Sequence, residues 1–466
     1  MAKNQSATAN ASVFETPTYP TNCLYFLQDH MQVRIPPSPN RKSQLLDIVI
    51  VGAGLGGLAT AIALAQSGHR VKVYEQASVL GEVGAGIQIP SNSMRLLAEL
   101  GLEPYLKDHA TEPKAIYFRR WQNGKTIGMT KLIPEFRQTY NAPYYVIHRA
   151  DFHSALHKRA LDVGVEIKLG SRAVSYNADT STITFENGSV VTADLIVAAD
   201  GVKSLARKVV LGGHDKVPQK TGFAAYRSTV KVERMQQDPE LDSLLTEPAL
   251  NIWVGDGRHV MTYKIGAGKT FNLVLSHPDN SDPREWDQSK ALDEMRAEFR
   301  GWDTKLTKVI NLIDKTIKWP LLSGSKLDQW VSERLVLLGD AAHAMVPYMS
   351  QGAAMAVEDG VALAHSLSKV HDSRDISKAL SIYQSVRTIR SSQMQEASLL
   401  NGQLWHFPDG PLQEARDLAM YPETVSRPFV HSPNQWSDPT TQLWCYGYDT
   451  KKAVEEEWEK RIANGF

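Results

Sequence analysis

The residues with the clearest chemical meaning are three glycines, Gly52, Gly54 and Gly57, followed by an acidic residue, Glu75. The glycines have the G-x-G-x-x-G spacing that lets a backbone turn approach a pyrophosphate and lets the next helix pack closely on a strand. A carboxylate about 20 residues further on can accept hydrogen bonds from an adenosine ribose, and its charge would repel a 2′-phosphate. The pattern therefore predicts an FAD or NAD site and leaves the choice between the two open; its alternative is a glycine-rich structural turn.

The elements expected around these glycines have the order that a dinucleotide site requires. An apolar, β-branched run over 46–51 predicts a buried parallel strand, and residues 71–75 predict the next one. Between them, an Ala-rich stretch over 58–67 predicts a helix that ends at Gly68. The N-terminus of this helix presents unpaired N–H groups and a positive dipole end to a phosphate.

Two further motifs follow along the chain. Asp200-Gly201-x-x-Ser204-x-x-Arg207 comes after an apolar run over 195–199, and Gly339-Asp340-Ala341-Ala342-His343 is followed by Pro347 and Gln351-Gly352-Ala353. These segments resemble the Asp-Gly motif and the second flavin motif of flavoprotein hydroxylases. With the first glycines, they make the chain similar to the group A FAD-dependent aromatic monooxygenases. The salicylate-hydroxylase-like branch and its fungal phenol-hydroxylating relatives are the most similar members.

The resemblance implies FAD as the bound cofactor and NADPH or NADH as a co-substrate. Because the chain has no second dinucleotide fingerprint, we expect no separate NAD(P)H-binding domain. It places Glu75 on the ribose and the N-terminus of a helix starting near Gln351 against the flavin. It also gives Asp200 and Arg207 a part in a nicotinamide groove. Ser350 stands where the family often has glycine, which bears on the shape of that loop. The implied FAD-binding residues are Gly52, Gly54, Gly57, Glu75, Gly86, Gln88, Arg149, Asp200, Asp340, Gly352 and Ala353.

The expected substrate site involves Arg227 and Tyr263. Arg227 follows an apolar strand start, and a buried arginine needs an anion such as a phenolate or a carboxylate. The resemblance implies that Arg227 holds the phenolate oxygen and that Tyr263 orients the ring, which makes both catalytic. A structural salt bridge and a core phenol are the alternatives. His148, His259 and His343 are interpreted as structural histidines.

The reaction that follows is hydroxylation of a phenolic or aromatic-acid substrate. NAD(P)H reduces FAD, the flavin reacts with O2 at C4a, and one oxygen atom enters the aromatic ring. Carbon dioxide would be released if the attacked carbon carries a carboxylate. One alternative is a biosynthetic enzyme that hydroxylates or dearomatises a polyketide-derived phenol. An alternative of another class is a non-catalytic dinucleotide-binding regulator.

The expected fold is α/β, with a discontinuous Rossmann-type FAD-binding domain, a second, mainly β substrate domain and a helical C-terminal region. The second domain is expected because four segments alternate or run apolar as antiparallel strands do: 223–232, 250–254, 259–265 and 270–276. The expected units are, in chain order, a disordered tail over 1–44, the FAD-binding domain over 45–220 and 321–400, the substrate domain over 221–320, and an extension over 401–466.

Composition narrows the partners and the compartment. The 466 residues include 51 Lys and Arg and 51 Asp and Glu, so no charge excess points to nucleic acid or to a membrane surface. The two cysteines, Cys23 and Cys445, lie far apart, which argues against a disulfide framework or a metal site. We expect a cytoplasmic enzyme, monomeric or homodimeric, that binds a small aromatic substrate and O2.

Overall fold

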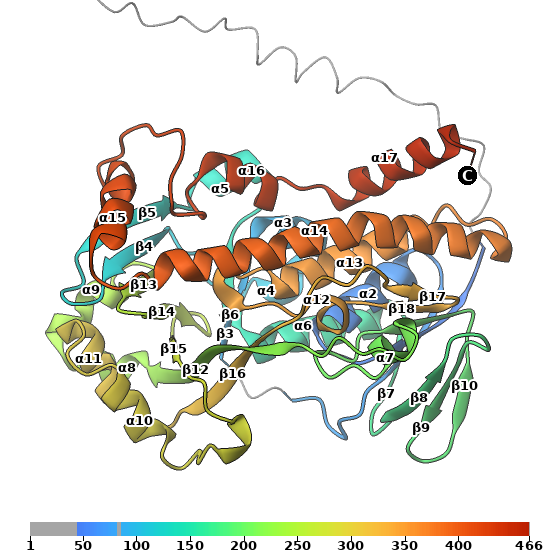
Figure 1. Ribbon diagram of the computed structural model, residues 1–466, viewed down its shortest axis with the longest axis horizontal. Coiled ribbons are helices and arrows are strands. Elements are labelled where there is room, and N and C mark those ends of the chain that lie inside the picture. The colour runs from blue at the N-terminus through green and yellow to red at the C-terminus, as the bar shows by residue number, and fades with distance from the viewer. Residues whose placement is uncertain (1–43, 82–84, 466) are drawn as a thin grey trace, which may run out of the picture. The chain divides into compact units, whose positions relative to one another are not determined.

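The computed structural model describes residues 44–81 and 85–465 (Figure 1). The tail expected over 1–44 therefore lies outside the described residues, apart from Gln44, and so do residues 82–84 of the glycine-rich segment before Gly86. Within the described ranges, no helix combines the length and the apolar character that crossing a membrane would require.

A six-stranded sheet carries the first motif. Its strand order is β17-β18-β11-β1-β2-β7, and every neighbouring pair is parallel except β17 and β18. The late strand β18 pairs with β11, so this unit is built from two separate stretches of sequence. The strands are β1 (Asp47–Val51), β2 (Arg70–Tyr74), β7 (Glu166–Lys168), β11 (Leu195–Ala198), β17 (Val331–Ser332) and β18 (Leu335–Leu337).

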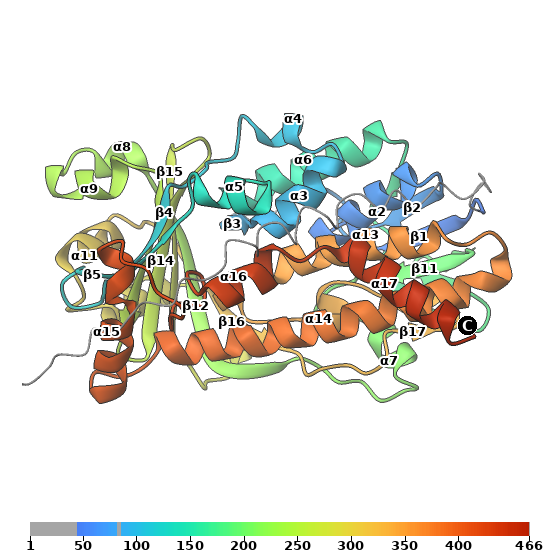
Figure 2. The same cartoon turned by 90° about the horizontal axis from the view of Figure 1, so that it is seen from above.

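Helices cover this sheet because their apolar faces complete its core. Helix α2 (Leu55–Gln66) packs against α6 (Arg149–Asp162) and α13 (Gly352–Leu367). The long helix α14 (Ile376–Trp405) packs along α13 and runs from the six-stranded sheet to the second large sheet (Figure 2). The mixed α/β fold with a parallel sheet is confirmed.

The second large sheet has seven strands in the order β16-β12-β15-β14-β13-β4-β5. The four strands expected between 223 and 276 are its centre. Two strands from earlier in the chain, β4 and β5, extend it, and β4 joins by parallel pairing with β13. The strands are β4 (Ala115–Arg120), β5 (Thr126–Lys131), β12 (Gln219–Lys231), β13 (Ala249–Gly255), β14 (Arg258–Ile265), β15 (Thr270–Pro278) and β16 (Ile317–Ser323).

The two faces of this sheet pack against different elements. One face packs on α10 (Ala291–Glu298) and α11 (Thr304–Asn311) through a buried apolar cluster that includes Tyr226 and Trp253. The other face turns towards a smaller ribbon of β3 (Gly86–Ile89) and β6 (Tyr145–His148). A three-stranded sheet consists of β8 (Ala173–Asn177), β9 (Thr182–Phe185) and β10 (Val190–Thr192), and Asn187-Gly188 lies in the turn between β9 and β10.

The C-terminal region is part of the core rather than an independent tail. Helix α15 (Pro411–Thr424) packs on β5, while α17 (Thr450–Ala463) packs on α13 and α14. One apolar cluster joins this region to the inner residues of β4 and α5 (Glu135–Tyr140). It contains the buried side chains of Trp405, Trp436 and Tyr446, and Tyr446 is the last residue of α16 (Pro439–Tyr446). The aromatic residues of this segment therefore build the core beside the second sheet.

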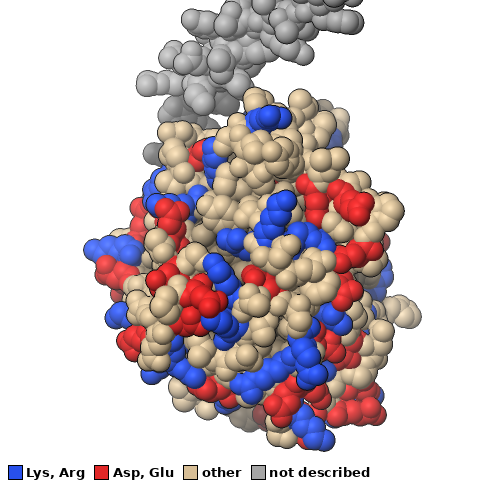
Figure 3. All heavy atoms as spheres, turned by 90° about the vertical axis from the view of Figure 1, so that its left-hand side faces the viewer, with Lys and Arg blue, Asp and Glu red and all other residues tan. Residues whose placement is uncertain are grey.

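On the side of α15, the surface carries both positive and negative side chains (Figure 3). The remaining helices are short connections. They are α3 (Ser91–Glu99), α4 (Glu103–Leu106), α5 (Glu135–Tyr140), α7 (Ala206–Val210), α8 (Val232–Met235), α9 (Asp242–Leu245) and α12 (Asp340–His343). The division of the chain into domains at residues 220 and 320 stays a prediction.

Candidate active site

A cavity of about 360 Å³ brings most of the predicted residues together between the two large sheets. The glycine turn and the N-terminus of α13 form one part of its wall, and β12, β14 and β15 form another. The predicted residues that line it are Gly54, Gly57, Gly86, Gln88, Arg149, Arg227, Tyr263, Asp340, Gly352 and Ala353. Gly52, Glu75 and Asp200 lie beside the lining rather than in it.

The glycine turn has the shape that its spacing predicted. Gly52 has a φ of +105°, and a Cβ there would lie 2.3 Å from the carbonyl oxygen of Ala199. A Cβ on Gly57 would lie 2.0 Å from the carbonyl oxygen of Gly52. A Cβ on Gly54 would meet no described atom within 4 Å. No side-chain hydrogen bond from a described residue caps α2 at this position. The turn therefore presents free N–H groups of a helix N-terminus to the cavity.

Glu75 directly follows β2 and holds the glycine turn in place. One of its carboxylate oxygens accepts a hydrogen bond of 2.8 Å from the N–H of Ala53, and the other accepts one of 2.8 Å from the N–H of Ala77. A carboxylate oxygen has a second lone pair, so both can accept again from a ribose hydroxyl.

Asp200 lies just behind the lining, between two residues, Ala199 and Gly201, that belong to it. Its Oδ2 accepts hydrogen bonds of 3.1 Å from the hydroxyl of Tyr176 and from the N–H of Leu205. Its Oδ1 is buried and has no hydrogen-bond partner among residues 44–81 and 85–465. Burial raises the pKa of Asp200. An unpartnered acceptor at this place fits a ligand that brings a hydroxyl or an N–H.

Arg207 is anchored inside the protein behind the Asp-Gly motif, and its part in a nicotinamide groove stays a prediction. Its side chain is 3% exposed and forms an ion pair of 2.7 Å with Asp215. Its guanidinium also donates to the carbonyl of Val202. The charge of Arg207 is therefore used inside the protein, where it fastens the segment after the Asp-Gly motif.

The second flavin motif leads into α13 through a left-handed residue. Ser350 has φ 54° and ψ 30°, which is a conformation that glycine adopts most easily. The loop therefore has a backbone form that glycine would adopt without strain, although the residue is serine. Helix α13 starts at Gly352 with no side-chain cap, and Gly352 and Ala353 both line the cavity. Its positive end is thus available to an anionic group of a ligand.

A buried network of charges joins the middle of α13 to α12 and α14. His343 Nε2 lies 2.6 Å from Asp359, and Arg387 donates to both Asp359 and Glu358 at 2.8 Å. The N–H of Gly339 also donates to Asp359. Burial alone would raise the pKa of Asp359, but His343 and Arg387 outweigh burial and lower it. His343 is therefore a structural residue, as interpreted from the sequence, and so is His148, which caps α6.

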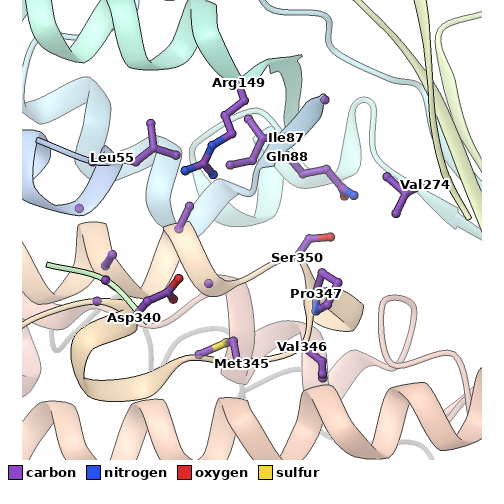
Figure 4. Close-up of a pocket in the computed structure, with 18 of the residues that line it drawn as sticks. Leu55, Ile87, Gln88, Arg149, Val274, Asp340, Met345, Val346, Pro347 and Ser350 are labelled. Atoms are coloured by element: carbon purple, nitrogen blue, oxygen red, sulfur yellow. The ribbon is translucent and has the colours of Figure 1, made fainter. Parts of the chain in front are cut away.

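Two charged side chains enter the cavity from opposite sides (Figure 4). Arg149 extends from the first turn of α6, and Asp340 extends from the start of α12. The N–H of Arg149 donates to the carbonyl of Ala85, which fixes the helix start beside β3. A ligand between these side chains meets a cation and an anion in turn.

The face of the second sheet forms the far wall. Arg227 on β12 and Met261 on β14 are both in register with Val274 on the strand between them, so the three form one row across the sheet. His259 and Tyr263 flank Met261 along β14, and side chains two apart in a strand share a face. All five residues line the cavity.

Arg227 has no counter-charge within the described ranges, and its Nε is buried without a partner. Burial lowers the pKa of Arg227, and Arg149 adds to this effect while Tyr263 opposes it. Tyr263 is 2% exposed, and burial raises the pKa of its phenol, which therefore stays protonated. No residue that the structure describes forms a salt bridge with Arg227, so a negative group of a ligand in the cavity could pair with it.

The cavity residues fit FAD. Two helix N-termini, those of α2 and α13, face the same cavity, and no side-chain hydrogen bond from a described residue caps either one. One suits a pyrophosphate and the other a flavin ring that becomes anionic on reduction. Gly54 leaves open space at the first, and Asp200 supplies an unused buried acceptor between them.

Sequence reasoning missed three residues of the sheet wall, His259, Met261 and Val274. The alternation of β14 contained the signal for the first two, because Tyr263 was already a candidate and residues two and four positions before it share its face. His259 was interpreted as a structural histidine, and it does contact His406, but it also lines the cavity.

Comparisons with known proteins show the family to which the chain belongs. The FAD binding domain family matches residues 46–398. FAD-dependent monooxygenase OpS4 of Beauveria bassiana is 36% identical over 409 residues, which cover 87% of this chain and 95% of that protein. 3-Amino-4-hydroxybenzoate 2-monooxygenase PtmB3 of Streptomyces platensis is 36% identical over 375 residues, covering 80% and 92% of the two chains.

A solved structure of a salicylate hydroxylase–substrate complex superposes with a TM-score of 0.71 at 28% identity and covers 89% of this chain and 98% of that one. The matched range contains the glycine turn, the Asp-Gly motif, the second flavin motif and all seven strands of the second sheet. The chain therefore belongs to the FAD-binding family of flavin-dependent aromatic monooxygenases, and FAD is its cofactor.

Proposed function

We propose that this enzyme hydroxylates a phenol that it binds as the phenolate, with NADH or NADPH as the electron donor. The observation that supports this proposal best is Arg227. Its side chain is partly buried, with a buried Nε that has no hydrogen-bond partner and no counter-charge among the described residues, and it lines the cavity that carries the flavin motifs. A buried cation of this kind is costly unless a ligand supplies the anion.

The protein groups bind, orient and shield the substrate. Bound FAD supplies reduction by NAD(P)H and the activation of O2. Arg227 stabilises the phenolate form, because a cation beside a phenol lowers its pKa. Tyr263 is neutral, so its hydroxyl can donate a hydrogen bond to the substrate without repelling the phenolate. The apolar side chains of the wall exclude water from the reacting atoms.

The lining favours a substrate with one acidic group on an apolar body. The wall beside the second sheet and the second flavin motif carries one cation, Arg227, the neutral polar side chains of His259, Tyr263 and Ser350, and the apolar side chains of Met261, Val274, Met345, Val346 and Pro347. One cation matches one phenolate, and a second ionised group would meet thioethers and aliphatic carbons there. This lining also suits the alternative of a biosynthetic enzyme that acts on a larger phenol. If the substrate carries a carboxylate at the attacked carbon, hydroxylation would release carbon dioxide.

The relatives' names support an aromatic substrate. One relative is named for 3-amino-4-hydroxybenzoate and a second, from Aquipseudomonas alcaligenes, for 3-hydroxybenzoate; both compounds are phenols. The cytoplasmic location and a monomeric or homodimeric state stay predictions from the sequence.

The test is NAD(P)H oxidation by the FAD-loaded protein with a panel of phenols, including salicylate, 3-hydroxybenzoate and alkylphenols, and with both nicotinamide nucleotides. We expect stimulation by phenols and none by the matching methyl ethers, which cannot ionise. Equal stimulation by a phenol and its methyl ether would contradict binding as the phenolate. A protein that holds FAD but oxidises no nicotinamide with any compound would favour the non-catalytic alternative.

A further inference from the structure

Gln88 places an amide at the boundary between the cofactor side of the cavity and the wall of the second sheet. It lies on β3, and its side chain is 6% exposed and lines the cavity. In Figure 4 the side chain of Gln88 extends towards Val274 of the sheet wall, whereas the guanidinium of Arg149 turns towards Leu55. The amide of Gln88 therefore faces the part of the cavity beside the second sheet.

Two contacts fix which end of this amide is the donor. The hydroxyl of Tyr144 donates to Oε1 of Gln88, and Nε2 of Gln88 donates to Sδ of Met261 on β14 at 3.0 Å. A thioether sulfur can only accept, so the opposite orientation of the amide would set its oxygen against another acceptor. Tyr144 is 1% exposed and packs edge-on against Phe136 and Tyr446. The amide is therefore held with its nitrogen beside Met261, which lines the cavity.

The protein itself makes little use of the two N–H groups of Gln88. Among the described residues, Sδ of Met261 is the one hydrogen-bond partner of Nε2, and a thioether is a weak acceptor. Neither N–H group thus donates to an oxygen atom of the described residues. A buried donor without a good acceptor is costly. An oxygen atom of a ligand in the cavity would give Gln88 the strong partner that it lacks.

The register of the sheet relates this amide to Arg227. Arg227 and Met261 are both paired with Val274, on the strand between theirs, so their backbones are two strand spacings apart, or about 9–10 Å. Arg227, Met261 and Val274 all line the cavity, and so does Gln88. An aromatic ring that lies over Val274 therefore has a cation on one side and an amide donor on the other.

The group that this amide suits is an uncharged acceptor. Gln88 carries no charge, and in the proposed function the phenolate takes the cation of this wall, Arg227. The neighbouring side chains of Met261 and Val274 are apolar, so a second anion would lose its hydration beside them without compensation. A carbonyl oxygen accepts a hydrogen bond from an N–H group and brings no charge into the cavity.

We propose that Gln88 is a specificity-determining residue that donates a hydrogen bond to an uncharged acceptor on the phenol, such as the oxygen of a carbonyl substituent; this rests on the proposed phenol hydroxylation. The substrate then has two different anchors, an ionised hydroxyl at Arg227 and a neutral acceptor at Gln88. Tyr144 is the positioning residue of this contact, because its hydroxyl holds the oxygen end of the amide. Two anchors on different sides of the ring fix its orientation in the cavity.

The test compares phenols that differ in the acceptor. Calorimetry on the FAD-loaded protein, without NAD(P)H, gives Kd values for the three hydroxyacetophenones and the three ethylphenols, in which a CH2 group replaces the carbonyl. For the hydroxyacetophenone that the native protein binds most tightly, we expect Gln88→Leu to weaken binding about three- to tenfold and to leave the matching ethylphenol unchanged. The carbonyl also makes the phenol more acidic, but this effect cancels because each compound is compared between two proteins.

Two further variants accompany this comparison. Gln393→Leu, at an exposed position of α14, is the matched control and should change neither affinity. Tyr144→Phe frees the oxygen end of the Gln88 amide and should lose part of the same preference. Flavin absorbance should show native FAD content in Gln88→Leu. Loss of FAD from that variant would assign the amide to the cofactor, as the sequence resemblance implies, and would overturn the proposal.

A second measurement uses the native protein and does not depend on a variant that folds. The carbonyl stretching band of a bound, carbon-13-labelled hydroxyacetophenone moves to lower frequency when its oxygen accepts a hydrogen bond. We expect the band below its frequency for the same phenolate in an aprotic solvent, and the shift should be lost in Gln88→Leu.

Three results would overturn the role of Gln88. They are an unshifted carbonyl band, an equal effect of Gln88→Leu on both members of the phenol pair, and tighter binding of the matching hydroxybenzoate, with affinities expressed for the phenolate form. Native protein that holds FAD but binds neither the hydroxyacetophenones nor the ethylphenols would instead contradict the proposed function.

Discussion

The N–H of Gly86 donates a hydrogen bond of 2.6 Å to Oδ1 of Asn272, which joins the β3–β6 ribbon of the flavin side to the second sheet. A Cβ on Gly86 would lie 2.4 Å from the ring of Tyr263, so the strand can approach the sheet only because this residue is glycine. One short contact thus sets the distance between the flavin side of the cavity and the proposed substrate wall.

Replacing Asn272 should loosen this contact. Asn272→Leu leaves the N–H of Gly86 without its acceptor, and we expect a loss of about 1–3 kcal/mol in the free energy of unfolding. Thermal and urea unfolding measure it. Thr262→Val on the neighbouring strand is the control, since the Thr262 hydroxyl is buried without a described partner and its loss should cost little. An Asn272→Leu protein as stable as the native one would contradict this role.

The glycine turn should tolerate no side chain at residue 57. In Gly57→Ala, the new methyl group meets the carbonyl oxygen of Gly52, so the turn must open and the helix N-terminus must move away from the phosphates. We expect the purified protein to lose most of its FAD, which absorbance measures as flavin per polypeptide. Gly81→Ala is the matched control, because a Cβ there meets nothing within 4 Å. Full flavin content in Gly57→Ala would show that the turn does not bind the pyrophosphate.

We expect the native Arg227 to strengthen phenol binding while it lowers the stability of the substrate-free protein. Arg227→Met removes a partly buried charge that no described residue pairs, so the substrate-free protein should become more stable, by about 1 kcal/mol. Phenol binding should weaken at least about tenfold, since a hydrogen bond to a charged group contributes about 1.5–3 kcal/mol. Calorimetry and binding titration measure the two effects. Arg284→Met, at a side chain that is 89% exposed, should change neither; a destabilised Arg227→Met protein would indicate a structural partner for Arg227.

The charge network under α13 should make stability depend on acid pH. The pKa values of Glu358 and Asp359 lie below their ordinary 4.5 and 3.8, so their contribution is complete above these values and is lost as the pH falls through the lowered ones. Arg387→Met leaves two buried carboxylates with less compensation, and we expect a cost of about 3–5 kcal/mol at neutral pH.

In that variant the two carboxyl groups should also protonate at higher pH than in the native protein. The free energy of unfolding, measured by denaturant titration from pH 7 downwards, should therefore converge with that of the native protein as the pH falls. A difference that is independent of pH would show that the loss comes from packing alone.

The sequence was sufficient where local pattern decides structure. Gly52, Gly54 and Gly57 fixed the turn, the apolar run before them predicted β1, and the alternation of β14 predicted a strand through Tyr263. The positions that line the cavity around the flavin motifs follow from these local signals, because the turn and the helix N-termini are each made by consecutive residues.

Pairing between distant segments could not be predicted. The strand β4 joins β13 in parallel across more than a hundred residues, and nothing in its own residues selects that partner. The contact of His259 with His406 is similar, since His406 follows the end of a long helix whose path is set by packing on α13. The cofactor side of the cavity could therefore be predicted from local sequence patterns, whereas the substrate side depends on tertiary contacts that those patterns do not determine.

The most direct test of the central claim follows the oxygen atom. The FAD-loaded protein is given NAD(P)H, a phenol that stimulates nucleotide oxidation, and isotopically labelled O2, and the product is analysed by mass spectrometry. We predict a product with one added oxygen atom that carries the label, formed by the native protein and strongly reduced in Arg227→Met. A product whose added oxygen comes from water, or nucleotide oxidation that yields only hydrogen peroxide with every phenol, would contradict a monooxygenase acting on a phenolate.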